Sequence, residues 1–99
     1  MSQVTLRVIA RLVARAGKED ALRSVLMGLI APTRKESGCI TYEMLQNKEN
    51  SREFTFVEEW RDEAALEVHF ATDHIQNALA NFPGLLAEDL DLRRYILVA

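Results

Sequence analysis

The 99-residue sequence has little of several residue types, and each shortage excludes a class of protein. Its single cysteine, Cys39, excludes an intrachain disulfide, and we interpret it as a small buried hydrophobe rather than a reactive thiol. The four glycines are isolated, so there is no glycine-rich loop for a nucleotide phosphate. No apolar run approaches the ~18 residues of a membrane span, and the first residues lack a signal-peptide pattern. We therefore expect a cytoplasmic protein with no membrane partner and no cofactor.

Positive charge of the kind that binds nucleic acid is also missing. Lysine and arginine number 12 against 15 acidic residues, the net charge is -3, and the basic residues are spread along the chain. The two histidines, His69 and His74, are five residues apart, which is not the i, i+4 spacing of a zinc helix. We expect neither a nucleic-acid partner nor a metal site.

What the sequence has is clear apolar periodicity in its first half. Residues 4–15 alternate between apolar and polar positions, which predicts a strand with one apolar face. Residues 18–37 carry apolar side chains at the i, i+3, i+4 and i+7 spacing of an amphipathic helix. Pro32 predicts a kink or a tightened last turn in this helix, and Gly38 predicts its stop.

The middle of the chain predicts a β-hairpin. Two strands, at 39–46 and 53–60, are joined by a polar turn. Side chains alternate across a strand, so Glu58 lies on the same face as Phe54, Phe56 and Trp60, whereas Glu59 lies on the other. Apolar residues occur on both faces of the first of these strands, for example Ile40, Tyr42 and Met44 against Cys39 and Leu45.

The last third predicts a helix in two pieces and a final strand. Asp62 is a suitable N-cap for a short helix whose apolar side holds Leu66, His69 and Phe70. Thr72 or Asp73 then caps a second helix that ends at Pro83 and Gly84, and a strand is expected over roughly 90–98.

This order of elements predicts an α+β, ferredoxin-like fold in one domain spanning 1–99. Its four-stranded antiparallel sheet would have helices on one face. The other face would be partly apolar and uncovered, and an apolar surface of that size usually marks a subunit interface. We therefore predict a two-fold homodimer packed through the sheet face.

The corner between the third strand and the next helix is the candidate site. It brings the carboxylate of Glu58, the indole of Trp60 and the imidazole of His69 toward one apolar cleft, the usual form of a small-molecule site. The alternative for each residue is structural. A histidine on an apolar helix face is commonly a satisfied core residue, a tryptophan commonly packs in the core, and His74 is suited to a surface or capping position. Glu58 needs a partner if it is buried.

The same corner carries a resemblance to a known family. The segments "SGCITYEMLQN", "FTFVEEW" and "RDEAALEVHFATDHIQ" are similar to the antibiotic biosynthesis monooxygenase (ABM) family. The matching residues are Gly38, Tyr42-Glu43, Glu58 with Trp60, the stretch 62–66, His69, and Thr72 with His74. The resemblance covers nearly the whole chain and implies a ferredoxin-like homodimer whose sheets join into a dimeric α/β barrel, with a pocket in each subunit.

The resemblance implies a cofactor-independent monooxygenase that oxidises a small aromatic substrate, phenol-, quinol- or anthrone-like, with O₂. On this hypothesis His69 is the catalytic base, and Glu58 orients it or shares its proton. Trp60 is a hydrogen-bond donor or a wall of the pocket on which the substrate stacks. The substrate-binding residues would be Tyr42, Phe56, Phe70 and His74.

Two alternatives stay open. One is an isomerase of a small phosphorylated carbonyl signal molecule, which needs an anion-binding patch such as Arg7, Arg11 or Arg93 could supply. The other is a non-catalytic dimer that binds a small ligand.

Overall fold

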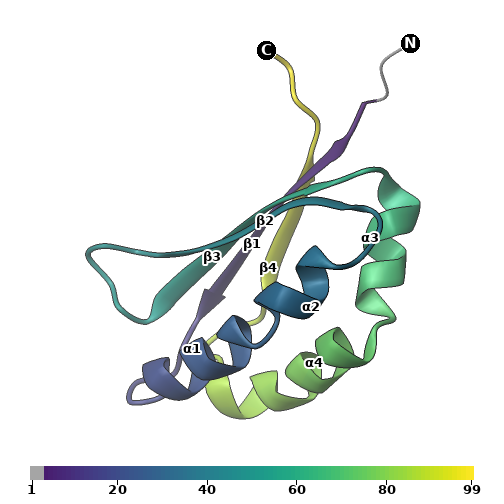
Figure 1. Ribbon diagram of the computed structural model, residues 1–99. Helices are drawn as coiled ribbons and strands as arrows, with labels where there is room; N and C mark the ends of the chain where they lie inside the picture. Colours follow the sequence, from purple (N-terminus) through teal and green to yellow (C-terminus); the bar gives the residue numbers. More distant parts are fainter. Residues whose placement is uncertain (1–3) are drawn as a thin grey trace.

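A computed structural model describes residues 4–99 as one antiparallel sheet with helices on one face (Figure 1). The strands are β1 (Leu6–Val13), β2 (Cys39–Gln46), β3 (Glu53–Trp60) and β4 (Asp91–Tyr95), in the order β2-β3-β1-β4. The helices are α1 (Glu19–Met27), α2 (Ile30–Arg34), α3 (Glu63–Phe70) and α4 (Asp73–Leu85). The fold is α+β and ferredoxin-like, which confirms the sequence prediction.

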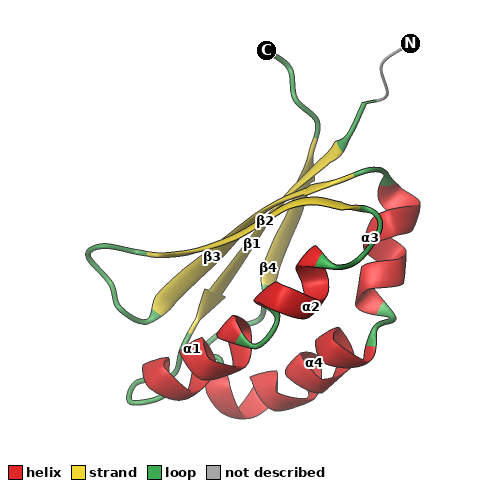
Figure 2. Ribbon diagram, in the orientation of Figure 1, coloured by secondary structure: helices red, strands yellow, loops and turns green. Residues whose placement is uncertain are grey.

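The core lies between the sheet and the helices. Val8, Phe54 and Trp60 on the sheet and Leu22 and Leu66 on the helices are completely buried. The opposite face of the sheet is left uncovered by any helix among residues 4–99, as Figure 2 shows. The alternation predicted for β1 and β3 is confirmed, and it assigns Glu58 to the core and Glu59 to the uncovered face.

The predicted long helix is broken into α1 and α2. The break falls at Gly28 and Leu29, one turn before Pro32, because proline has no N–H to donate to the Gly28 carbonyl four residues earlier. Leu29 instead donates its N–H to Leu26 O at 3.1 Å, a tighter turn.

Gly38 does not end a helix, because α2 already ends at Arg34. A Cβ at Gly38 would lie 2.3 Å from the Cβ of Ala65, so this glycine is required by the close approach of α3 to the start of β2. The next residue but one, Ile40, is the extra residue of a β-bulge, since Cys39 pairs with Trp60 and Thr41 with Glu59. As a result Cys39, not Ile40, shares the inner face with Tyr42 and Met44, and Ile40 is exposed.

Two predicted ends were also wrong. Helix α4 continues through Pro83 to Leu85, and β4 stops at Tyr95 instead of Val98. The two predicted caps are confirmed: the Asp62 carboxylate accepts a hydrogen bond from Ala65 N at 2.9 Å, and the Thr72 hydroxyl accepts one from Ile75 N at 3.4 Å. These caps set the directions of α3 and α4 and thereby the position of His69 between them.

Candidate functional site

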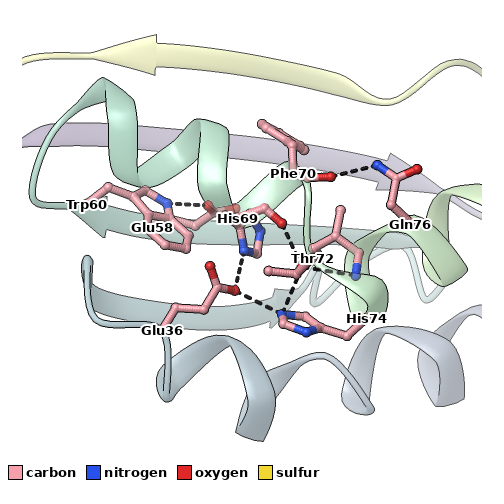
Figure 3. Close-up of polar contacts among 9 residues, drawn as sticks. Glu36, Glu58, Trp60, His69, Phe70, Thr72, His74 and Gln76 are labelled. Atoms are coloured by element: carbon pink, nitrogen blue, oxygen red, sulfur yellow. Dashed lines mark hydrogen bonds and ion pairs between the residues drawn. The ribbon is translucent and has the colours of Figure 1, made fainter.

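The strand-to-helix corner brings together the residues predicted from the sequence. Glu58 and Trp60 at the end of β3 and His69 near the end of α3 are all at most 5% exposed. The rings of Trp60 and His69 lie 4.5 Å apart, and the Trp60 indole N–H donates a hydrogen bond of 2.8 Å to Glu58 Oε1 (Figure 3). The indole donor is therefore already used by Glu58, so Trp60 orients this carboxyl instead of offering a free donor to a ligand.

Burial gives Glu58 an unusual proton affinity. Removal from water raises the pKa of its carboxyl from 4.5 to about 7, against the lowering effect of the Trp60 hydrogen bond, and the negative charge of Glu36 raises it further. Near neutral pH the carboxyl is thus available both as an acid and as a base.

Glu36 joins the site from the loop between α2 and β2. Its Oε2 lies 2.7 Å from Nδ1 of His69 and 2.9 Å from Nε2 of His74, so one carboxylate oxygen bridges two histidines (Figure 3). Thr72 adds a third link, since its hydroxyl donates to the His69 carbonyl at 2.7 Å and lies 3.3 Å from His74 Nε2. We name Glu36, His69 and His74 the bridged cluster; carboxylate and imidazole are also common metal ligands.

The sequence interpretation missed Glu36, which lies near the end of the helix predicted over residues 18–37. The one feature of the sequence that could have indicated Glu36 is its position just before the second predicted strand. Strand β2 begins three residues later beside the end of β3, where Cys39 pairs with Trp60, so a residue just before β2 lies next to the corner.

His69 is held in one orientation. An ionised Glu36 can only accept, so its 2.7 Å contact places the imidazole proton on Nδ1 and leaves the Nε2 lone pair free. Nε2 makes no hydrogen bond to any residue of the described range 4–99. Burial lowers the pKa of His69, while its hydrogen bond to Glu36 opposes that change. The ring is thus favoured as a neutral base with a fixed proton.

A small apolar cavity opens beside His69, between the sheet and α4. Its volume is about 40 Å³. Among the predicted residues, His69, Glu58, Tyr42, Phe56 and Phe70 line it; the other walls are aliphatic or phenyl side chains, such as Leu26, Leu29, Leu79 and Phe82. Trp60 and His74 are not part of this lining. Tyr42 stacks on Phe56 with ring centres 4.9 Å apart, and burial raises the pKa of its hydroxyl, so it remains protonated.

The arginines considered for an anion site lie elsewhere. Arg7, Arg11 and Arg93 are on the uncovered face of the sheet, and none lines the cavity. Each lies near a carboxylate: Arg7 is 3.6 Å from Glu59, Arg11 is 2.8 Å from Glu88, and Arg93 is 3.0 Å from Asp91. The cavity therefore has no cluster of arginines among residues 4–99.

Comparison with known proteins identifies the family. The sequence pattern described as "Antibiotic biosynthesis monooxygenase" matches residues 5–81. The chain belongs to this family. It is 35% identical over 79 residues to "Putative monooxygenase Rv0793" of Mycobacterium tuberculosis, which covers 80% of this chain and 77% of that protein. The family and this relative support a monooxygenase-like, oxidoreductase function.

Further similarities extend over the whole fold of this ABM-family chain. It is 30% identical over 88 residues to "Uncharacterized protein sll1783" of a Synechocystis species, covering 89% of this chain but only 60% of that protein. The crystal structure of PA3566 from Pseudomonas aeruginosa superimposes with a TM-score of 0.95 at 33% identity, covering 100% of this chain and 99% of that one. No helix within residues 4–99 is long and apolar enough to cross a membrane.

Proposed function

We propose that this protein is a cofactor-independent monooxygenase that oxidises a small phenol-, quinol- or anthrone-like substrate with O₂ in the apolar cavity. The observation that carries the proposal is the state of His69. Its Nδ1 is held by Glu36, and the ring lines the cavity with Nε2 free of hydrogen bonds to the described residues. A neutral base beside an apolar cavity is what proton removal from an aromatic substrate needs.

The reaction on an anthrone-like methylene starts with transfer of a ring-activated C–H proton to His69 Nε2. The resulting carbanion gives one electron to O₂, and the substrate radical and superoxide combine to form a C–O bond. The histidinium proton then goes to the terminal oxygen and gives a hydroperoxide. His69, neutral again, removes the second C–H proton as the O–O bond breaks. One oxygen atom becomes the product carbonyl, and the leaving hydroxide takes up that proton and departs as water.

The surroundings of His69 fit these steps. Glu58 lines the cavity, and with its pKa near 7 a large fraction of its carboxyl is protonated at neutral pH. The protonated form can donate a hydrogen bond to the developing substrate oxyanion, and Trp60 holds it in place. The aromatic and aliphatic walls exclude water, which protects the carbanion from simple reprotonation.

Substrate entry requires the cavity to widen. Its volume of about 40 Å³ is well below the ~150 Å³ of an engineered cavity that binds benzene. Side chains at its edge therefore move outward when an aromatic ring binds. The widening that is needed grows with the size of the substrate, so an anthrone requires a larger movement of these side chains than a single-ring quinol.

The uncovered sheet face supports a homodimer as part of the proposal. Ile9 and Val57 lie at its centre and are only partly buried, and Leu45 and Tyr95 are about half exposed at 53% and 46%. Charged pairs such as Arg7–Glu59 and Arg11–Glu53 are interspersed among them, as at a polar interface rim. Packing two such faces about a two-fold axis would remove this apolar surface from water. Multi-angle light scattering at micromolar concentration tests the homodimer. A measured mass of 11.2 kDa, that of one chain, would exclude it.

The proposed activity is tested by oxygen uptake with a panel of quinols and anthrones. We expect uptake by the wild-type protein and loss of most of it in His69→Ala, with roughly 10²–10⁴-fold lower kcat for removal of a general base. Glu59→Gln is the matched control, because this acid is adjacent to Glu58 but faces away from the cavity. No uptake with any substrate, or equal rates in His69→Ala and wild type, would contradict the proposal.

A further inference from the structure

The bridged cluster has a composition that the proposed oxidation does not require. A neutral His69 needs one acceptor for its Nδ1 proton, yet Glu36 also lies 2.9 Å from His74 Nε2. The three possible ligand atoms, Glu36 Oε2, His69 Nδ1 and His74 Nε2, all lie within 4.8 Å of one another. Two imidazoles and one carboxylate are a known three-ligand set for zinc, with a fourth position left for water or another group.

We propose that the bridged cluster binds a divalent transition-metal ion, with Zn²⁺ as the probe that defines it. Two neutral imidazoles and one carboxylate suit zinc, cobalt, nickel and copper ions better than Mg²⁺ or Ca²⁺, which prefer oxygen ligands. The net charge of the ligand set with Zn²⁺ is +1, which is acceptable at a site that is only partly closed.

An unpaired atom in the cluster supports this assignment independently of the distances. Glu36 Oε1 is buried and has no hydrogen-bond partner within residues 4–99. Such an oxygen is costly in a protein interior. A metal ion bound through both carboxylate oxygens, or a metal-bound water that donates to Oε1, would satisfy it.

The site is accessible and needs little rearrangement. The side chain of His74 is 23% exposed and that of Glu36 is 11% exposed, whereas His69 is closed off at 4%. Ligands at ~2.0–2.2 Å from a tetrahedral ion lie about 3.3–3.5 Å apart. The three atoms therefore need shifts of about an ångström, which rotation of His74 at the start of α4 can supply.

Metal binding has a defined consequence for His69. A neutral imidazole has one proton, so a metal ion on Nδ1 requires that proton to be on Nε2. Nε2 then carries the proton and can no longer accept one from a substrate. The metal would inhibit the oxidation; this consequence rests on the proposed function, whereas the binding itself does not.

Isothermal titration of tag-free, chelator-treated protein with ZnCl₂ tests the binding. We expect one ion per chain for wild type. Glu36→Gln and His74→Ala each remove a metal ligand. Loss of a residue that only hydrogen-bonds a ligand typically lowers metal affinity by roughly 10–100-fold, so these two variants should lose more zinc affinity than that. Glu59→Gln, an acid on the uncovered face, is the matched control and should bind like wild type. Circular dichroism checks that each variant is folded.

Two results would overturn the proposal. One is no zinc uptake by folded wild-type protein at 100 µM metal, a concentration well above typical zinc-site affinities. The other is equal uptake by wild type, Glu36→Gln and His74→Ala, which would place the ion elsewhere on the surface. If a substrate is found, zinc should inhibit wild type and Glu59→Gln alike. Zinc binding together with no oxidation by the metal-free protein would support the metal site and count against the proposed function, so the two failures are distinguishable.

Discussion

Replacement of Glu58 by glutamine should make the protein more stable at high pH and nearly unchanged at low pH. In the wild type the pKa of this carboxyl is 4.5 when exposed and about 7 when folded. At about 1.4 kcal/mol per pKa unit, the ionised form is roughly 3 kcal/mol less favourable in the folded protein than in the unfolded chain. Glutamine has no charge to bury, and its carbonyl can still accept the Trp60 indole hydrogen bond.

The sign follows from proton binding. Because the folded pKa is raised, the folded protein holds the Glu58 proton more tightly than the unfolded chain between pH 4.5 and 7. The contribution of the Glu58 carboxyl to stability is therefore fully present below pH 4.5, falls as the pH rises, and levels off above pH 7. Burial lowers the pKa of His69 in both proteins, so its contribution cancels in the difference.

Urea denaturation at pH 5 and pH 8 measures the effect. The free energy of unfolding of Glu58→Gln minus that of wild type should increase by about 2–3 kcal/mol between these pH values. The control is Glu59→Gln, which faces the other side of the sheet and should show no such increase. A difference between Glu58→Gln and wild type that is the same at both pH values would refute the claim that burial controls this carboxyl.

Three further predictions concern the surroundings of the site. Gly38→Ala places a Cβ 2.3 Å from that of Ala65 and should lower the free energy of unfolding by about 1–3 kcal/mol, whereas unchanged stability in urea would show that α3 can move away. Asp62→Ala removes the N-cap of α3 and should lower the free energy of unfolding by about 1 kcal/mol. An unchanged Tm in thermal melts would contradict this prediction. Because burial raises the pKa of the Cys39 thiol, its reaction with Ellman's reagent at pH 8 should be slower in the folded protein than in urea, and equal rates would show an open thiol.

The sequence predicted the parts of the site that belong to periodic elements. Strand alternation separated Glu58 from Glu59, and the apolar side of a short helix assigned His69 to the interior; both assignments are confirmed. These predictions worked because one face of each element is buried, which makes a period of 2 or 3.6 visible in the residue types.

Other features have no periodic signal. Glu36 lies in a loop, and its contacts are to residues 33 and 38 positions away, so nothing local marks it. The glycine at 38 looked like a helix stop because the approach of Ala65 cannot be read from neighbouring residues. The bulge at Ile40 likewise depends on the pairing of β2 with β3 and changes which of its side chains face inward.

The bridged cluster has a consequence for how the protein folds. Its acid comes from the loop before β2, and its histidines come from the end of α3 and the start of α4, so no short segment contains the whole site. Closing these long loops costs chain entropy that the cluster's two hydrogen bonds cannot offset alone, and the packing of both halves of the chain must supply the rest. The site therefore requires α3 to pack beside the start of β2, where Ala65 approaches Gly38. A partial opening that lifts α3 and α4 from the sheet would abolish it while leaving the β-hairpin intact.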